Sequence, residues 1–591
     1  MTSEKELPLH VGGGASRTHK LRRAHHFGVL AVVLLTLLVW CLSYRDSTPI
    51  HLLFTDPHHE PDALCPIVPK IDPTKHLANP DTLKYILTNK KFHKRARKNL
   101  AGAVRIPTQV YDDMENPTSA KSLHELYQIE PRWKTFERLH EYLHDTYPLV
   151  HKHLHVKKVN KLGLVYTWKG KDKSKKPIML AAHQDVVPVP LETVDQWTHP
   201  PFSGDFDGEF MYGRGVSDCK NLLIALLSTV ELLLQEGDFK PKRTIVLAFG
   251  YDEEALGQGA KHILEHLLDK YGPDSFLQII DEGDEGYEEI EGVKFILPAT
   301  GEKGHLNSVI ELYTPGGHLS VPPKHTSIGI VAQLITRIED NDFTPVLSNA
   351  NPVLGQLYCL AEHSPHLDKE LRSSILKSQL DAGANERVVE YLTRDKQTQF
   401  LIQSSQAVDI VQGGVKSNAL PEHVSVLVNT RIAVEESVAS VVEKFKRDVL
   451  DIAGKFDLGF VLDGQEVIPI KDKPNGYFNY SLVEQLEPAP VSPTNGQSWE
   501  VFGGSLRYLF EELVFPETND TFVVAPFLST GNTDTKSYWD LTRNIYRYQP
   551  SIGAADSHIH SIDEKLWFEG HLHIIGYYYF YLQLIDSYDD F

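Results

Sequence analysis

The sequence predicts an α/β fold in which a mostly parallel sheet carries helices on both faces. Three apolar runs, each long enough for one strand, lie at 178–182, 244–251 and 276–280. Residues 221–236 carry leucine and isoleucine at helical spacing and stop at Gly237, which predicts a helix with a glycine end. Apolar strands separated by amphipathic helices are typical of such sheets, and ligands bind beyond the carboxyl ends of their strands.

Composition sets the size and the broad class of the protein. The chain has 591 residues, 41% hydrophobic and 23% charged, which is a globular balance and too long for one small core. Its formal net charge of −20 argues against a nucleic-acid partner, because nucleic-acid binding needs clustered basic residues. The 4 cysteines are too few for a disulfide scaffold, and none form a CxxC pair.

The first hundred residues predict a membrane attachment. Residues 27–44 are uncharged and apolar over about the length that crosses a bilayer, and four basic residues precede them. The positive side should stay in the cytosol, so we expect a cytosolic tail (1–26), a single-pass type II anchor (27–44) and a lumenal remainder. A cleaved signal peptide is the alternative, which the long polar lead disfavours. Prolines between 49 and 80 favour an extended stalk over 45–100.

A lumenal location would make two other features meaningful. Asn479 and Asn519 each begin an Asn-x-Ser/Thr acceptor for glycosylation. Cys65, Cys219 and Cys359 would lie in an oxidising compartment, where their odd number leaves at least one unpaired. Nothing in the sequence says which of them pair.

One short motif matches a zinc-binding pattern, but we do not interpret it as a metal site. His140, Glu141 and His144 match HExxH, in which two histidines one helical turn apart bind zinc. The third ligand of such a site does not follow downstream, and Pro148 closes the helix soon after. We therefore interpret this segment as a surface helix with solvated histidines.

Acidic and histidine residues follow the apolar strands directly. His183-x-Asp185, Glu254 and Asp281 each come after one strand, Asp218 lies in a glycine-bearing loop before the 221–236 helix, and His560 lies near the C-terminus. Carboxylates and imidazoles that converge at strand ends are what two closely spaced divalent metals require. Asp185 would hold the ring of His183 by a hydrogen bond.

These motifs resemble the M20 metallopeptidases, the clan of di-zinc carboxypeptidases and aminoacylases. The matching segments are HxD at 183–185, GRGxxDxK at 213–220 and DEExxGxGA at 252–260, with PGGHLSVPP around His318 and TGNTDTKSYW from Thr530. The resemblance implies a catalytic domain in two parts, 101–302 and 466–591, interrupted by a smaller α+β lid domain at 303–465.

Residue roles follow from the resemblance. It implies two Zn²⁺ ions, with Asp218 bridging, Glu253 as general base, and His318 of the lid stabilising the oxyanion. Asn418 and Arg431 would hold the terminal carboxylate of the substrate. Glu282 stays open as an alternative to Asp281. The implied metal ligands are His183, Asp218, Glu254, Asp281 and His560.

The implied activity is hydrolysis of short peptides of the Gly-Xaa type from the C-terminal side. Similarity to fungal vacuolar members of the family places it in the vacuole lumen, in nitrogen recovery, and allows a homodimer through the lid. An N-acyl-amino-acid hydrolase is the close alternative, since it needs the same metals. A non-catalytic membrane glycoprotein of the same fold is the more distant one.

Overall fold

The computed structural model describes residues 63–471, 473–553 and 557–590. None of the helices in these ranges is both long and apolar enough to cross a membrane. The predicted tail (1–26) and anchor (27–44) lie outside the described residues, so the membrane attachment stays a prediction.

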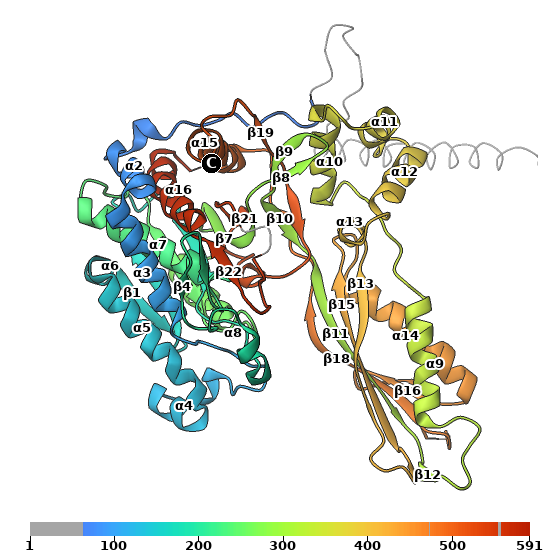
Figure 1. Ribbon diagram of the computed structural model, residues 1–591. Helices are drawn as coiled ribbons and strands as arrows, with labels where there is room; N and C mark the ends of the chain where they lie inside the picture. The colour runs from blue at the N-terminus through green and yellow to red at the C-terminus, as the bar shows by residue number, and fades with distance from the viewer. Residues whose placement is uncertain (1–62, 472, 554–556, 591) are drawn as a thin grey trace, which may run out of the picture. The chain divides into compact units, whose positions relative to one another are not determined.

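A mixed eight-stranded sheet forms the centre of the larger part of the chain (Figure 1). The predicted strands are confirmed, and β6, β3, β7 and β21 run parallel to one another. The prediction of a mostly parallel sheet is only partly right, because β1–β2, β2–β6 and β10–β21 pair antiparallel. In spatial order the strands are β1 His155–Val159, β2 Gly163–Trp168, β6 Ile245–Gly250, β3 Ile178–His183, β7 Gln278–Glu285, β21 Ile545–Gln549, β10 Ala299–Glu302 and β20 Phe527–Ser529.

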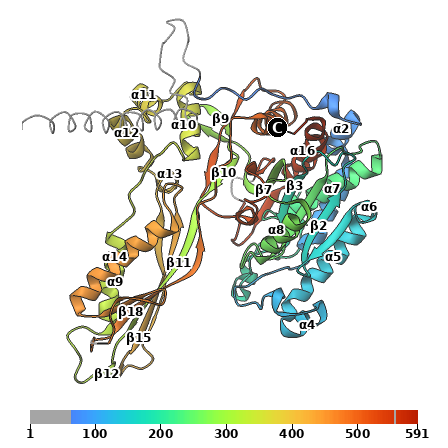
Figure 2. The same cartoon turned by 180° about the vertical axis from the view of Figure 1, so that it is seen from behind.

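Helices cover both faces of this sheet, as predicted (Figure 2). Alternate residues of β3 enter different cores: Leu180 packs with α7 and α16, whereas Met179 packs with α8. The period of two follows from the pleat of a strand. The predicted helix is α7, which ends at Gly237 in the left-handed region with φ +77°. The helices of this part are α4 Leu123–Ile129, α5 Lys134–Thr146, α6 Pro148–His153, α7 Lys220–Glu236, α8 Gln258–Tyr271, α15 Gln497–Tyr508 and α16 Phe568–Ser587.

The predicted stalk over 45–100 is wrong from residue 80 onward. Two helices, α2 Pro80–Thr88 and α3 Lys90–Val104, occupy that stretch and bury one face in the main core. Asn79 accepts a hydrogen bond from the Asp81 N–H, and Pro80 takes the first helical position, where a missing N–H costs nothing. The same proline that suggested an extended chain therefore begins a helix.

The lid contains a six-stranded sheet with two helices on one face. Its long central strands are buried at every second residue, and those residues pack on α9 Ser327–Asp340 and α14 Val438–Phe456. The predicted boundary at residue 465 cuts this sheet, because β18 pairs with β11 along its length. In spatial order the strands are β13 Ser405–Gly413, β15 His423–Ile432, β11 Gly304–Tyr313, β18 Tyr477–Leu486, β16 Gly459–Leu462 and β17 Gln465–Ile468.

A helical insert interrupts the lid and packs elsewhere. Its residues share a core with β9, β19 and β20 rather than with the lid helices. A disulfide between Cys65 and Cys359 joins the insert to the start of the described chain. Among the described residues, Cys219 is the free cysteine, and it is buried. The insert comprises α10 Pro352–His363, α11 Lys369–Lys377, α12 Ala382–Leu392 and α13 Lys396–Gln399.

Three small sheets complete the described structure. One closes the end of the lid, one lies beside the insert, and one joins the loop before α7 to the C-terminal region. They are β12 Gly317–His318 with β14 Ala419–Leu420; β19 Phe522–Val524 with β9 Val293–Ile296 and β8 Glu288–Ile290; and β22 Lys565–Trp567 with β5 Phe210–Tyr212 and β4 Asp205–Phe206.

Candidate metal centre

The carboxyl ends of three neighbouring strands bring together two groups of possible metal ligands. One group holds His183, Asp218 and Glu282, with the thiol of Cys219 beside them, and the other holds Asp218, Glu254 and His560. In each group the donor atoms lie within 4.8 Å of one another. Asp218 belongs to both groups, so its carboxylate lies between two candidate cation positions.

The two oxygens of Asp218 point to different histidines. Oδ1 lies 2.9 Å from His183 Nε2, and Oδ2 lies 3.0 Å from His560 Nε2. Glu254 Oε1 lies 3.1 Å from the same His560 nitrogen. This is the arrangement of a carboxylate that bridges two ions, each of which also takes a histidine and a further carboxylate.

Glu282, and not Asp281, faces this centre. Glu282 Oε1 lies 3.3 Å from His183 Nε2. Asp281 accepts the N–H of Glu282 with Oδ1, and its buried Oδ2 has no hydrogen-bond partner among the described residues. The prediction of Asp281 as the ligand is thus contradicted by the geometry, because successive side chains of a strand point to opposite faces.

The loop that carries Asp218 is held by a buried glutamate. Glu564 accepts the N–H groups of Gly215 and Ser217, each at 3.0 Å, and that of Asp218 at 3.3 Å. Its other oxygen pairs with Arg214 Nη1 at 2.6 Å. Glu564 lies four residues after His560, so one short segment supplies a candidate ligand and fixes the loop of another. We did not predict this residue, although its place in the HIHSIDE segment was a usable signal.

The three consecutive acids after β6 have different tasks. Asp252 caps α8 by accepting the N–H of Gly259 at 2.6 Å and that of Gln258 at 3.0 Å. The Glu254 N–H donates to Asp185 Oδ2 at 3.0 Å, which fixes the backbone of that candidate ligand. Glu253 lies between them, is absent from both ligand groups, and has a pKa that burial raises well above its usual value.

Asp185 supports His183 in two ways. His183 Nδ1 lies 3.1 Å from the backbone carbonyl of Asp185 and 3.4 Å from its carboxylate. The carbonyl is therefore the closer acceptor, and the predicted carboxylate contact is the longer one. Both contacts leave Nε2 of His183 directed at the candidate metal position.

The electrostatics of the centre fit a divalent cation. Hydrogen bonds to Asp218 and Glu254 raise the pKa of His560 to about 10, so the carboxylates stabilise positive charge at this point. Two imidazoles and three carboxylates are donors that suit Zn²⁺. Burial raises the pKa of Cys219 well above its usual value, which keeps that neighbouring thiol neutral.

The three lid residues predicted to contact the substrate lie at opposite ends of the lid sheet. Arg431 is half-buried at the end near the metal centre, where the Glu253 carboxylate acts on its pKa and Nη1 donates to Asn532 Oδ1 at 2.8 Å. His318 and Asn418 are exposed beyond the other end, where β12 pairs with β14 (Figure 1). The strand between Arg431 and His423 spans about 27 Å, so His318 and Asn418 do not reach the centre of the same chain here.

The HExxH segment is not a surface helix with solvated histidines throughout. His140 is only 7% exposed and lies 2.8 Å from the side-chain oxygen of Gln184 through Nε2, whereas His144 is exposed. Burial lowers the pKa of His140 to about 4. The histidine is therefore a neutral core residue that supports the backbone between His183 and Asp185, and it belongs to neither ligand group.

The two glycosylation acceptors differ in setting. Asn519 is exposed in a loop after α15, whereas Asn479 lies within β18 and donates to Glu311 Oε2 at 3.0 Å. Glycosylation stays a prediction for both, and Asn519 is the more accessible side chain.

Comparisons with known proteins agree with this architecture. A family model described as Peptidase family M20/M25/M40 matches residues 179–583. Carboxypeptidase S of Saccharomyces cerevisiae is 41% identical over 543 residues, which cover 90% of this chain and 91% of that protein. The human N-fatty-acyl-amino acid synthase/hydrolase PM20D1 is 30% identical over 478 residues, which cover 80% of this chain and 84% of that protein.

A solved structure extends the likeness to the fold. The di-peptidase Dug1p of Saccharomyces cerevisiae superposes with a TM-score of 0.55 at 14% identity, covering 86% of this chain and 99% of the other. The family resemblance predicted from the motifs is confirmed by the family model and by the relatives. The chain belongs to peptidase family M20/M25/M40.

Proposed function

We propose that the protein is a di-zinc carboxypeptidase that releases the C-terminal residue of short peptides such as Gly-Leu. The observation that carries the proposal is the pair of ligand groups that share Asp218 at the ends of the strands. The ligand set we propose is His183, Asp218 and Glu282 for one ion and Asp218, Glu254 and His560 for the other.

Two zinc ions bound there would supply Lewis-acid polarisation of the scissile carbonyl and a positive field that acidifies a water molecule. Glu253 acts as the general base, because it interacts electrostatically with His183 and Glu282 but belongs to neither ligand group. Its carboxylate takes a proton from water and later delivers it to the nitrogen of the leaving amine. The raised pKa of Glu253 suits a group that must hold the proton between those two events.

Arg431 holds the substrate's terminal carboxylate. Its planar guanidinium offers five donors, of which the Asn532 contact uses one. Lys536, whose pKa is raised in part by Glu253 and Asp534, adds a second positive charge near the centre. A free C-terminal carboxylate is therefore the feature that this site selects.

An N-acyl-amino-acid hydrolase is the second candidate function. Such substrates carry the same amide and the same carboxylate, and one relative is described as acting on N-fatty-acyl amino acids. The metal centre and Arg431 suit both substrate classes, so the difference depends on the surfaces that receive the rest of the substrate.

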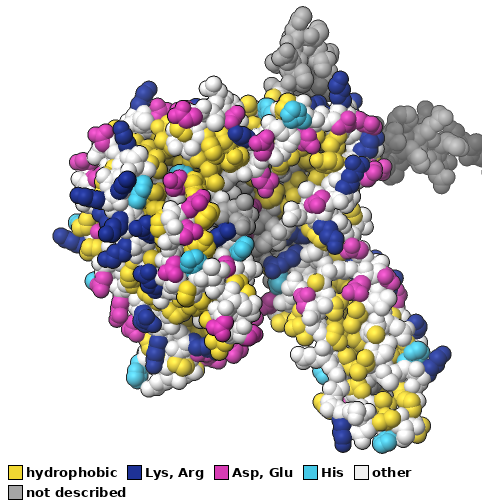
Figure 3. All heavy atoms as spheres, viewed as in Figure 1, with side chains coloured by type: hydrophobic (Ala, Val, Ile, Leu, Met, Phe, Trp, Pro, Cys, Tyr) yellow, Lys and Arg dark blue, Asp and Glu magenta, His cyan; other side chains and the backbone are white. Residues whose placement is uncertain are grey.

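A second copy of the chain would supply His318 and Asn418. The edge strand β13 exposes Ile410 and Val411, and hydrophobic side chains gather on the lid in Figure 3. An unpaired, apolar edge strand is a surface on which two chains can pair. We infer a homodimer through the lid in which His318 enters the partner's site to stabilise the oxyanion.

The test combines metal removal with a matched substrate pair. The purified protein should hydrolyse Gly-Leu, lose this activity on chelation and regain it with Zn²⁺, whereas Gly-Leu-amide, which lacks the carboxylate, should be a poor substrate. Glu282→Gln should lower the bound zinc, and Asp281→Asn should retain it. Hydrolysis that survives complete metal removal would refute the proposal.

The setting of the reaction is proposed as well. We propose a lumenal vacuolar enzyme, anchored by residues 27–44, that recovers nitrogen from peptides. Protease treatment of intact vesicles should spare the domain that follows residue 62, and its digestion would contradict this topology.

A further inference from the structure

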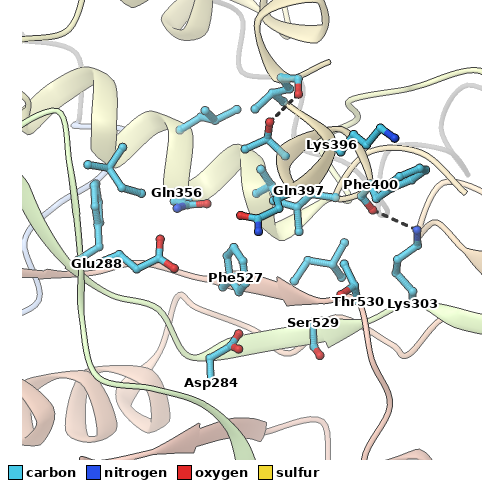
Figure 4. A pocket seen from close by; sticks show the side chains of 18 of the residues that line it. Asp284, Glu288, Lys303, Gln356, Lys396, Gln397, Phe400, Phe527, Ser529 and Thr530 are labelled. Atoms are coloured by element: carbon cyan, nitrogen blue, oxygen red, sulfur yellow. Dashed lines mark hydrogen bonds between the residues drawn. The ribbon is translucent and has the colours of Figure 1, made fainter. Parts of the chain in front are cut away.

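A large cavity lies between the helical insert and the edge of the main sheet, and Arg431 is part of its lining. Its volume is about 790 Å³, within the range typical of small-molecule sites. Figure 4 shows Phe527 above β20, facing the helices of the insert. The walls are mainly apolar, and they include Phe295 of β9, Leu357 and Leu360 of α10, and Leu392 of α12.

One end of the cavity is formed by Arg431, Lys303 and Ser529. Lys303 Nζ is engaged by two backbone carbonyls, Phe400 O at 3.0 Å and Gln403 O at 2.7 Å. Lys303 thus keeps one of its three donors, whereas Arg431 gives one nitrogen to Asn532 and keeps the rest of its five, so Arg431 is the group at this end that can grip a carboxylate with two donors. The apolar cavity therefore starts where the substrate's carboxylate is held.

We propose that this cavity is the specificity pocket for an apolar side chain on the substrate's C-terminal residue, an inference that rests on the proposed function. The side chain and the carboxylate of that residue are bonded to the same α-carbon. A carboxylate fixed on Arg431 consequently places the side chain at the entrance of the cavity. The volume accommodates leucine, phenylalanine and larger apolar groups.

Two carboxylates in the cavity lining disfavour substrates with an acidic C-terminal side chain. Asp284 and Glu288 line the cavity, and both are exposed. An acidic side chain would be repelled by them and would lose its hydration in the apolar part. Gly-Asp should thus be a poorer substrate than Gly-Leu even though both offer the same carboxylate to Arg431.

The experiment measures kcat/KM ratios within one substrate series. The wild-type protein should prefer Gly-Leu to Gly-Ala by about 10- to 100-fold, because each buried methylene contributes roughly a fourfold factor. Phe527→Asp should lower this ratio at least tenfold, and Phe527→Leu should keep it within about threefold. Gln356→Leu, which makes another wall position apolar, should raise the ratio about two- to fourfold and covers the case in which Phe527→Asp does not fold.

Controls separate the pocket from the function. Leu380→Asp makes the same change at a leucine that is 92% exposed in the insert, and it should leave the ratio unaltered. An unchanged ratio in folded Phe527→Asp overturns the proposal. The proposal is also overturned if Phe527→Asp lowers kcat/KM only for acetyl-, octanoyl- and palmitoyl-leucine and not for the Gly-Xaa peptides, since the cavity would then hold the acyl chain. Failure of the wild type to cleave either Gly-Ala or Gly-Leu refutes the proposed function instead.

Discussion

The two ends of the lid sheet differ in how completely the chain determines them. At the end near the main sheet, Arg431 is half-buried, bonded to Asn532 and within the field of Glu253. At the other end, His318 is exposed, and within the described part of the chain its ring nitrogen bonds to Ser320, two residues away. The end near the main sheet is built from contacts within one chain. The residues at the other end are exposed and lie away from the candidate metal centre.

The candidate metal centre and His318 are therefore built by separate parts of the chain. The centre depends on contacts between distant parts of the sequence, such as Glu564 with the Asp218 loop. His318 is held by the two-residue pairing of β12 with β14 at the tip of the lid. Substitutions at the centre should therefore act within one chain, and substitutions at His318 should be open to compensation by another chain.

The largest effect should come from Glu253→Gln, which tests whether the centre is complete within the chain. The amide keeps the shape of the side chain but cannot accept the proton, so turnover should fall by roughly 10²–10⁴. Bound zinc should stay at the wild-type level. A variant that loses zinc but keeps its turnover per bound metal would exchange the roles of Glu253 and Glu254.

His318→Ala tests the remote end. Loss of a preorganised oxyanion donor should lower turnover by about 10²–10³ without loss of metal. Mixing this variant with Glu253→Gln should restore up to about a quarter of the wild-type rate, because random pairing in a two-fold dimer rebuilds one intact site in half of the molecules. If the two variants are shown to exchange subunits and the mixture still recovers no activity, His318 would have to reach the centre of its own chain by closure of the lid.

Arg431→Lys tests the end of the lid sheet near the main sheet. The positive charge remains but the two-pronged grip on a carboxylate is lost, so KM for Gly-Leu should rise about 10- to 100-fold with a smaller change in kcat. Mixing with another variant should give no rescue, since Arg431 acts in its own chain. A KM that stays at the wild-type value would remove Arg431 from substrate binding.

A substitution at His140 should have the smallest effect on activity, and its main effect should be on the pH dependence of stability. Its pKa in the folded chain is about 4, below the value near 6.5 in an unfolded chain, so the unfolded form takes up the proton first. Stability is fully present above about pH 6.5 and declines as the pH falls toward 4, by on the order of 3 kcal/mol.

His140→Gln should therefore make the free energy of unfolding less dependent on pH between 4 and 6.5, with turnover near the wild-type value at neutral pH. Urea unfolding at several pH values measures this slope. His571 and His573, whose pKa values burial also lowers, to about 3 and about 4, should keep part of the dependence in the variant. Equal slopes in the two proteins would contradict the buried neutral state of His140.

Much of the centre could be predicted because its residues follow buried strands directly. His183, Asp218, Glu254 and His560 were predicted and come together as ligand groups. Asp281 and Glu282 could not be told apart, since both follow the same apolar run and only the phase of the strand decides which side chain faces His183. That phase depends on the pairing of β7 with β3 and β21, which the local sequence does not specify.

The errors elsewhere also have physical causes. His140 was interpreted as solvated, although it lies on the same helical face as the buried Phe136, Leu139 and Leu143. The stalk prediction took the recurring prolines as a sign of extended chain. It overlooked that Asn79 followed by Pro80 is a helix start signal. The cavity had no local signal at all, because its walls come from segments that are far apart in the sequence.

The disulfide between Cys65 and Cys359 has a consequence for the order of events during biosynthesis. Its two cysteines are 294 residues apart, so the bond cannot form until the first part of the main sheet and the β11 and α9 segments of the lid have been synthesised. None of the candidate metal ligands contacts it, whereas α10, which carries Cys359, also forms a wall of the cavity. Because His560 is synthesised after Cys359, the nascent chain can close the disulfide, and so attach α10 in the cavity wall, before the candidate metal centre is complete.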